Sequence, residues 1–320
     1  MNGTFAPKLR VATYNVHGCV GMDRQRSEAR IAEVIAQLSV DIVGLQELDL
    51  SRRRSAGVDQ TGIIAEQLGW HSHFYPAMRR GDEQYGNAIL SRYPLMFRRA
   101  AELPGIAPFF CRENRTAIGM DVETNLGAVH IVTTHLGLGW RERLLQAKLF
   151  TSVEWHAAIA DDIPLILLGD FNCLPGSRPH RALVSHLHDV RELVRAKRPI
   201  GTFPTSFPAL AVDHIFVNAA LQPVSLTVHR STVARIASDH FPLIAELVLS
   251  SDAPLSDEES LSQMTASSTY ALGEWQGFRS DHTPGITRSR RKPTGRLATE
   301  LASETINETN ANIILNRRCS

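Results

Sequence analysis

The sequence predicts an α/β protein built on a mixed β-sheet. An early strand–helix–strand pattern is followed by segments that resemble consecutive antiparallel strands, and no internal repeat is present. A strand–helix–strand order favours parallel pairing, whereas strands joined by turns favour antiparallel pairing. Polar residues also follow the predicted strands directly, which is typical of a ligand site at one edge of a sheet.

The elements follow from apolar periodicity and from cap residues. Residues 9–16 alternate and are β-branched, so they predict a strand, and residues 27–38 predict a helix capped by Ser27. A buried strand at residues 40–46 precedes a helix opened by Thr61. The other predicted strands cover residues 86–91, 116–122, 128–135, 164–169, 211–217, 223–229 and 242–249.

A longer helix is predicted between Glu142 and Ile159. Its period places Leu145, Leu149 and Val153 on one side.

The composition of the 320-residue chain is that of a globular enzyme, with 43% hydrophobic residues, 21% charged residues and a net charge of +1. These values exclude a wholly disordered chain and a strongly basic nucleic-acid coat. No segment approaches the roughly 18 apolar residues of a membrane span, and the first residues lack the apolar core of a signal peptide. The four cysteines are widely spaced, which argues against a disulfide framework or structural zinc. We expect a cytoplasmic monomer with no integral membrane segment and no obligate protein partner.

The chain divides into two parts. Residues 1–250 contain periodic apolar segments and are long enough for one catalytic domain. Residues 251–320 are rich in Ser, Thr, Asn and charge without an apolar period, which predicts a disordered low-complexity tail. The basic run from Arg288 to Arg296 is interpreted as a solvated part of that tail, with contact to nucleic acid or acidic lipid as the alternative.

Polar side chains occur where the predicted strands end. Each of them alone has a structural explanation, such as a turn or a hydrogen-bonded histidine, but their joint position at strand ends predicts one site. The residues are Asn15, Glu47, His135, Asp170, Asn172, Asp239 and His240.

The chemistry of this set suits phosphoester hydrolysis. Carboxylate and amide oxygens without thiolates are the ligands that Mg²⁺ or Mn²⁺ prefer. Histidines beside carboxylates suit proton transfer and the stabilisation of a developing anion. The sequence contains no P-loop, nucleophile elbow, HExxH or Rossmann motif, which excludes the commonest rival enzyme classes.

Seven motifs between about residue 9 and residue 249 carry a family resemblance. They are TYNVHG, LQELD, YGNAILSRYPL, TTHLG, GDFN, VDHIFV and SDHFPL. In this order and spacing the chain resembles the endonuclease/exonuclease/phosphatase superfamily, which includes DNase I, exonuclease III and neutral sphingomyelinases. It is most similar to the bacterial metal-dependent hydrolases of that superfamily, through THLGL at 134–138, Glu142-Arg143 with Gln146, and Thr202-Phe203-Pro204.

The resemblance implies a DNase I-like, four-layer αββα sandwich in which two mixed sheets face each other. It also implies roles for the matched residues. Asn15, Glu47 and Asp239 would hold Mg²⁺ or Mn²⁺. The expected catalytic residues are His135, Asp170, Asn172, Asp213 and His240. Asn87 and Arg115 would contact the substrate phosphate.

Within this set, the resemblance implies a distinct task for each histidine. His240 would be a general base or oxyanion stabiliser, oriented by Asp213, while Asp170 would orient or deprotonate the attacking water. His135 would stabilise phosphate or protonate the leaving oxygen.

The sequence departs from the family pattern at two places. His17 stands where some members have an acid, which argues against a metal ligand there. The acid that pairs with the second histidine in DNase I is matched by Tyr85, so the acid partner of His135 stays open, and Glu83 in the preceding loop is not favoured. His214 is interpreted as a strand residue that faces away from Asp213.

The substrate stays open between several phosphodiesters. A nucleic-acid substrate needs a basic track, for which the candidates are Arg52–Arg54, Arg79–Arg80 and Arg98–Arg99. A phospholipid or sphingomyelin substrate needs an apolar membrane contact, for which Leu103–Phe110 is the candidate. Residues 1–250 carry 26 Lys and Arg against 24 Asp and Glu, so their charge does not favour nucleic acid strongly. A catalytically silent binding module is the alternative outside the enzymes.

Overall fold

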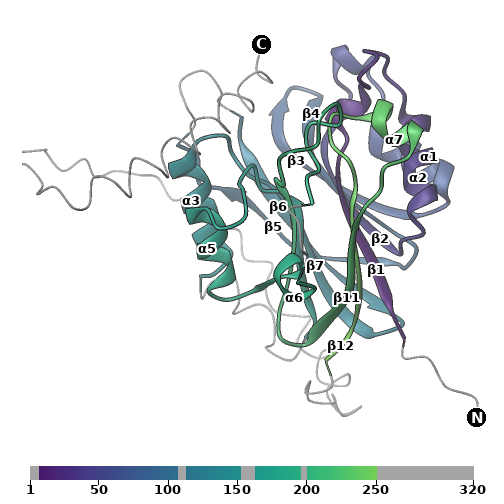
Figure 1. The fold of residues 1–320 in the computed structure, drawn as a ribbon. Coiled ribbons are helices and arrows are strands. Elements are labelled where there is room, and N and C mark those ends of the chain that lie inside the picture. Colours follow the sequence, from purple (N-terminus) through teal and green to yellow (C-terminus); the bar gives the residue numbers. More distant parts are fainter. Residues whose placement is uncertain (1–6, 107–112, 153–162, 196–199, 251–320) are drawn as a thin grey trace, which may run out of the picture. The chain divides into compact units, whose positions relative to one another are not determined.

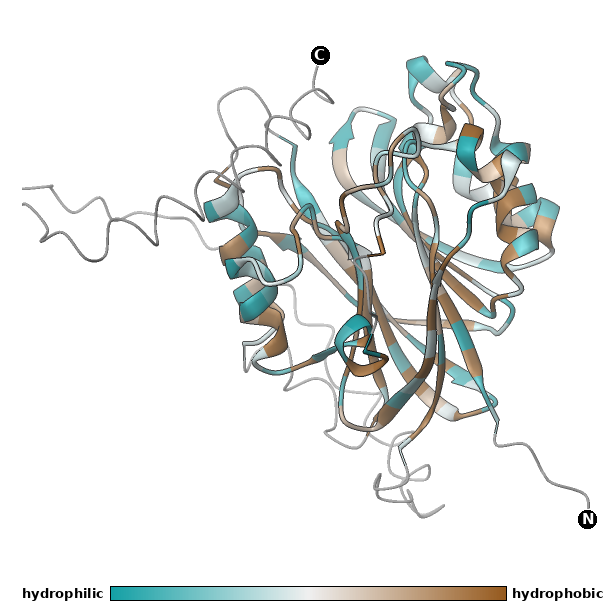
Figure 2. Cartoon of the chain, viewed as in Figure 1, coloured by the Kyte–Doolittle hydropathy of each residue, from teal (hydrophilic) through white to brown (hydrophobic). Residues whose placement is uncertain are grey.

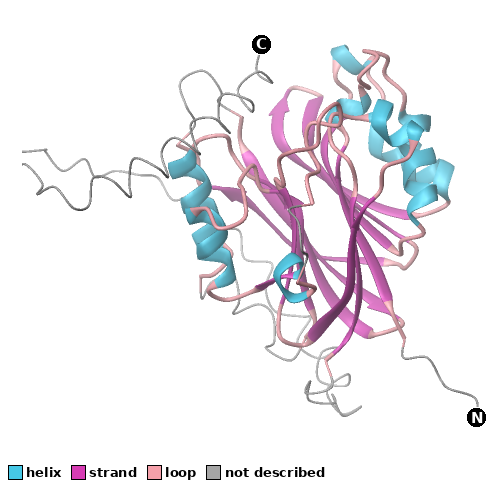
Figure 3. Ribbon diagram, viewed as in Figure 1, coloured by secondary structure: helices cyan, strands magenta, loops and turns pink. Residues whose placement is uncertain are grey.

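The computed structural model describes residues 7–106, 113–152, 163–195 and 200–250. These residues form two six-stranded sheets that face each other, with helices on both outer sides (Figures 1 and 3). Each sheet contains one parallel strand pair among antiparallel pairs, so both sheets are mixed. The predicted four-layer αββα sandwich is confirmed. The predicted tail at 251–320 lies outside the described residues.

The first sheet has the strand order β11-β12-β1-β2-β4-β3. Its strands are β1 (Leu9–Asn15), β2 (Ile42–Leu50), β3 (His71–Arg80), β4 (Glu83–Ser91), β11 (Leu221–Val228) and β12 (Leu243–Leu249). The outer face of this sheet packs against α1 (Glu28–Leu38), α2 (Gln60–Leu68) and α7 (Thr232–Ala237). Two short 3-10 turns follow β1 and β2, at His17–Cys19 and Arg53–Ser55.

The second sheet has the strand order β5-β6-β7-β8-β10-β9. Its strands are β5 (Leu95–Leu103), β6 (Arg115–Thr124), β7 (Gly127–His135), β8 (Leu165–Asp170), β9 (His188–Asp189) and β10 (Asp213–Val217). The outer face of this sheet packs against α3 (Trp140–Leu149) and α5 (Arg178–Val184). The short helix α6 (Val190–Leu193) follows β9 directly.

The core lies in three layers. One apolar cluster fills the space between the two sheets, and one lies on the outer side of each sheet beneath the helices (Figure 2). Strand periodicity produces this arrangement, because successive side chains point to opposite faces. In β1, for example, Leu9 and Val11 belong to the cluster between the sheets, whereas Ala12 and Tyr14 belong to the helix-covered cluster.

Most strand predictions are confirmed, but the two-residue strand β9 and two longer strands, β3 and β5, were not predicted. Both are edge strands, and each is interrupted by a bulge, between Pro76 and Met78 in β3 and between Phe97 and Arg99 in β5. A bulge shifts the side-chain alternation by one residue and so hides the period. Helix α2 begins one residue before Thr61, and its N-cap is Asp59.

The prediction for the long helix is partly wrong. Helix α3 spans Trp140–Leu149, and residues 153–162 lie outside the described ones. Leu145, on the apolar side of this helix, is 41% exposed, whereas Glu142, Arg143 and Gln146 are buried. The buried side of α3 is therefore largely polar. It is hydrogen-bonded to the loop after β7, where the Gly137 amide donates to the side chain of Gln146. Among the described residues, no helix is long and apolar enough to cross a membrane.

Candidate active site

The space between the sheets changes from apolar to polar toward one end. In β1 the inward-facing series runs from Leu9 and Val11 to Thr13 and Asn15, and in β8 it ends at Asp170. The parallel pairs β1–β2 and β7–β8 bring their carboxyl ends to the same edge. Strand order and alternation together deliver these polar side chains to one site.

Glu47 reaches this site through a β-bulge. The pairing of β2 with β4 shifts between Leu45 and Leu48, and Glu47 has a φ of 65°. A non-glycine residue in the left-handed region is uncommon, and such residues are enriched at functional sites. The bulge aims Glu47 at Asn15, whose Nδ2 donates to Glu47 Oε1 at 2.8 Å and to Asp170 Oδ2 at 2.9 Å.

Asp170 Oδ2 is the centre of the cluster. The Nε2 atoms of His135 and His240 lie 3.5 and 3.6 Å from it, on two sides. His240 Nδ1 lies 2.8 Å from Asp213 Oδ2. Because an ionised aspartate only accepts hydrogen bonds, Nδ1 carries the proton and Nε2 is the nitrogen that faces Asp170. Asp170, Asp213 and His240 are all fully buried.

The ring of His135 lies between Arg115 and Asn172. Arg115 Nη1 lies 3.0 Å from His135 Nδ1, and the amide of Asn172 lies 3.0 Å from Nε2. A guanidinium only donates hydrogen bonds, and the Asn172 atom nearest Nε2 is the amide nitrogen Nδ2, also a donor, so each ring nitrogen of His135 faces a donor. The sequence left the acid partner of His135 open: Glu47 Oε1 lies 4.0 Å from His135 Nδ1, whereas Glu83 lies 3.6 Å from Arg53 in an ion pair.

Asp239 and Glu47 lie on either side of His17. His17 Nδ1 is 3.6 Å from Glu47 Oε2 and 3.8 Å from Asp239 Oδ2. Sequence reasoning treated His17 only as a departure from the family pattern, although its position two residues after Asn15 was the available signal. The peptide N–H of His17 also donates to Asn15 Oδ1 at 3.0 Å, which fixes the orientation of that amide.

Asn87 and Thr202 lie beside the central residues. Asn87 donates to the backbone oxygen of Thr116 at 3.1 Å, next to Arg115. The Thr202 hydroxyl donates to Asp213 Oδ2 at 2.5 Å, the same oxygen that binds His240. The ring of Phe203 packs on His240 at 4.8 Å between centroids. The sequence reasoning placed Thr202 in a family motif without a role.

Tyr85 lies beside Glu47 and is kept protonated. Burial raises its pKa above the usual value, and the nearby Glu47 carboxylate raises it further. The guanidinium groups of Arg52 and Arg54 lie 5.6 and 5.4 Å from the centre of its ring. Tyr85 therefore adds no negative charge to the site.

The candidate basic track is largely neutralised by acids. Arg52 and Arg54 pair with Asp49, Arg53 pairs with Glu83, and Arg98 pairs with Asp121. Paired surface arginines supply less of the unscreened positive charge that binds a phosphate backbone. The other candidate contact, Leu103–Phe110, falls partly on residues 107–112, outside the described ones.

The donor set fits a divalent cation. The carboxylates of Glu47, Asp170 and Asp239 gather here, and ligand atoms of Glu47, His135 and Asp170 lie within 4.8 Å of one another. Asn172 Oδ1 is buried and has no hydrogen-bond partner among the described residues. Several negative charges and an unpartnered buried oxygen are the surroundings in which Mg²⁺ or Mn²⁺ binds.

A sequence model of the Endonuclease/Exonuclease/phosphatase family matches residues 12–240. The chain therefore belongs to this family of phosphoesterases, and the resemblance seen in its motifs is confirmed.

Relatives of known sequence or structure agree with this assignment. The uncharacterized protein YbhP of Escherichia coli K12 is 30% identical over 259 residues, which cover 75% of this chain and 96% of YbhP. An endonuclease/exonuclease/phosphatase of Beutenbergia cavernae superimposes with a TM-score of 0.60 at 22% identity, covering 78% of this chain and 73% of that one. The mannosyl-6-phosphatase of Bacteroides thetaiotaomicron superimposes with a TM-score of 0.58 at 23% identity, covering 75% and 99%. These two structures share the fold.

Proposed function

We propose that this protein is a divalent-metal-dependent phosphodiesterase that hydrolyses its substrate by attack of water in line with the leaving oxygen. The observation that carries the proposal is the position of Asp170 Oδ2, between the Nε2 atoms of two buried histidines and bonded to the Asn15 amide that also binds Glu47. Structural ion pairs do not require two imidazoles and two carboxylates to converge at the end of a sheet.

The metal would be held by Glu47, Asn15 and Asp239. Bound Mg²⁺ or Mn²⁺ would neutralise phosphate charge and polarise the phosphoryl oxygen. Asn15 Nδ2 holds Glu47 and Asp170 in fixed positions, and the His17 amide fixes Asn15 in turn. The ligands are thus oriented by the protein before a metal binds, as in well-formed metal sites.

The hydrolytic step would use the Asp213–His240 pair. Asp170 orients the attacking water, His240 Nε2 accepts its proton, and Asp213 stabilises the resulting imidazolium through Nδ1. His135, which Arg115 and Asn172 hold beside Asp170, would stabilise a phosphate oxygen. Asn172 and Arg115 from the side of the second sheet, and Asn87 from β4 of the first sheet, would contact the phosphate.

Hydrolysis of bis-p-nitrophenyl phosphate tests the proposal. Purified protein should turn over this diester with Mg²⁺ or Mn²⁺, and EDTA should abolish the activity. Glu47→Ala should lower kcat at least about 1000-fold, since it removes the principal metal ligand, and should remove Mg²⁺ binding in a calorimeter. The exposed acid Glu66 on α2 provides the control, because Glu66→Ala should retain wild-type values. Wild-type turnover by Glu47→Ala would refute the metal assignment.

A substrate panel separates the possible diesters. Plasmid DNA, RNA, sphingomyelin and glycerophospholipids represent the diesters, and sugar phosphates represent the monoesters that a mannosyl-6-phosphatase relative brings into question. Cleavage of monoesters alone would refute the diester assignment while leaving the metal site in place.

A further inference from the structure

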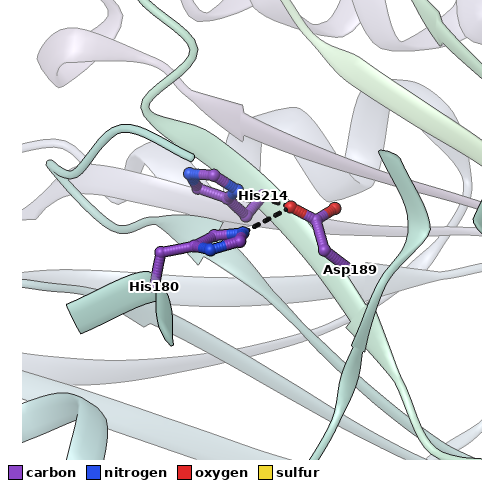
Figure 4. A group of neighbouring side chains, drawn as sticks. All are labelled: His180, Asp189 and His214. Atoms are coloured by element: carbon purple, nitrogen blue, oxygen red, sulfur yellow. Dashed lines mark hydrogen bonds and ion pairs between the residues drawn. The ribbon is translucent and has the colours of Figure 1, made fainter. Parts of the chain in front are cut away.

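A second cluster of histidine and aspartate lies on the outer face of the second sheet. It joins His180 of α5, Asp189 of β9 and His214 of β10, all of which are buried (Figure 4). One oxygen, Asp189 Oδ2, lies 2.9 Å from His180 Nε2 and 3.2 Å from His214 Nδ1. None of these residues belongs to the metal or proton-transfer groups described above.

The His214 ring is a buried cation. Its Nδ1 faces the Asp189 carboxylate, and its Nε2 lies 2.9 Å from the backbone oxygen of Cys173. Both partners only accept hydrogen bonds, so both ring nitrogens carry protons. Burial alone would lower the pKa of His214, but the hydrogen bonds to Asp189 and Cys173 outweigh it and raise the pKa to about 10. Hydrogen bonds from His180, His214 and the Arg191 amide lower the pKa of Asp189 despite its burial.

The cluster is not arranged to hold a metal. The peptide N–H of Gly176 points at His180 Nδ1 at 3.2 Å, so the proton of that ring is on Nε2, the nitrogen that faces Asp189. A protonated nitrogen cannot ligate a metal. The three residues are instead a closed hydrogen-bonded ion pair, in which His180 and His214 both donate to one carboxylate.

His214 contacts the residues on both sides of Asn172. It donates to the oxygen of Cys173, and the ring of Phe171 meets it edge-on at 5.7 Å between centroids. Asn172 itself has a φ of 49°, in the left-handed region that asparagine adopts more readily than most residues with a side chain. The contacts at Phe171 and Cys173 hold the backbone in this conformation, which directs the Asn172 amide toward His135.

His214 is also the neighbour of Asp213 on β10. Successive strand residues face opposite sides, so Asp213 points between the sheets to His240 while His214 points outward to Asp189. Any shift of His214 therefore moves Asp213 in the same strand. We propose that His214, held as a cation by Asp189, is a positioning residue that fixes Asn172 and Asp213 in the active site. The kinetic test of this proposal rests on the proposed function, whereas the hydrogen–deuterium exchange test does not.

Hydrogen–deuterium exchange tests the proposal without reference to activity. In His214→Phe the peptide spanning residues 169–176 should exchange at least about tenfold faster, because the amides of Phe171 and Asn172 lose the support of their hydrogen bonds to Val212 and Asp170. The matched control is His130→Phe, since His130 is also buried on the outer face of this sheet and pairs with Asp121 at 2.6 Å. Equal exchange of this peptide in both variants would overturn the proposal.

The kinetic test uses the same pair of variants at a temperature where both are folded. His214→Phe should lower kcat for the diester about 100-fold with KM changed less than about threefold, because displacement of catalytic groups by an ångström costs this much. His130→Phe should keep kcat within about threefold. His214→Gln retains an N–H donor for the oxygen of Cys173 and should recover part of the lost kcat. Equal losses of kcat in His214→Phe and His130→Phe would contradict positioning.

Two outcomes separate this inference from the proposed function. If the wild type hydrolyses no diester, the proposed function fails, and the exchange comparison still decides the role of His214. If His214→Phe does not fold, His214→Gln is compared with His130→Gln instead. Faster exchange of residues 169–176 in His214→Gln but not in His130→Gln supports positioning. Equal exchange in the two variants overturns it.

Discussion

Strand β10 places two histidine–aspartate pairs on its two faces. On the inner face Asp213 accepts from His240 Nδ1, and His240 Nε2 faces Asp170 across 3.6 Å, a distance too long for a good hydrogen bond. On the outer face Asp189 accepts from His214 Nδ1, and His214 Nε2 donates to the protein backbone at 2.9 Å. The environment of the second ring nitrogen thus distinguishes a histidine placed for proton transfer from one held as a cation at neutral pH.

The two pairs also differ in what surrounds the carboxylate. Asp213 accepts from the Thr202 hydroxyl and from His240 on one oxygen, while its buried Oδ1 has no hydrogen-bond partner among the described residues. Asp189 uses both oxygens, since Oδ1 accepts from the peptide N–H of Arg191 at the start of α6. The outer pair is therefore fully satisfied, as expected of a structural element.

Asp213→Asn breaks the inner pair and should have the largest effect. An amide in place of the carboxylate favours the wrong tautomer of His240 and no longer stabilises its cation, so kcat should fall about 1000- to 10,000-fold. Steady-state hydrolysis of the model diester measures this. Asp121→Asn, which alters the outward-facing His130 pair, serves as the control. A loss below about tenfold in Asp213→Asn would show that His240 acts without it.

Asp189→Asn breaks the outer pair and should chiefly reduce stability. It leaves the His214 cation buried without its counter-charge, and breaking a buried ion pair costs about 3–5 kcal/mol. Urea unfolding followed by circular dichroism gives the free energy of unfolding. The exposed neighbour His186 supplies the comparison, because His186→Gln should change this free energy by less than about 0.5 kcal/mol. Equal stability of the two variants would rule out the charged pair.

The outer pair should also appear in the pH dependence of stability. The pKa of His214 is raised from 6.5 to about 10 on folding, so its contribution is complete below pH 6.5 and is lost as pH rises toward 10. The difference in Tm between wild type and His214→Gln should therefore shrink between pH 6.5 and 9.5. A difference that stays constant over this range would show that His214 is neutral in the folded protein.

Thr202→Val perturbs the inner pair and should cause the smallest loss of kcat among these substitutions. It removes the hydroxyl that donates to Asp213 Oδ2 while keeping a similar shape. Loss of one hydrogen bond to a charged group should lower kcat about tenfold with little change in KM. Thr202→Ser keeps the hydroxyl and should restore activity to within about threefold, so equal defects in both variants would point to lost packing instead.

The local sequence pattern was sufficient to predict the elements in which buried and exposed residues follow a regular period. The alternation at Leu9–Asn15 and the cap at Ser27 predicted β1 and α1 correctly, because period and capping are properties of neighbouring residues. The pattern failed at the bulged edge strands and at α3, where a polar side faces inward to bond a loop. In α3 these tertiary bonds override the usual preference for apolar burial.

The candidate site was likewise only partly predictable from the sequence. The motifs, through their family resemblance, identified the residues that the structure brings together, including Asp170 and His240. They did not identify Arg115 as the partner of His135 or recognise the contacts of His17 with two carboxylates. Such pairings depend on which polar groups meet across strands, and the apolar periodicity of the sequence does not predict them.

Sequence by itself determined the alternation of β10, which requires Asp213 and His214 to face opposite sides of the sheet. It also determined the fold, through apolar strands whose order and motifs match one family. Only the tertiary structure decided what each side chain meets: a reactive cluster between the sheets for Asp213, and Asp189 with the Cys173 backbone for His214. The reason is physical, since ring protonation depends on the donors and acceptors within about 3 Å, and here those come from distant parts of the chain.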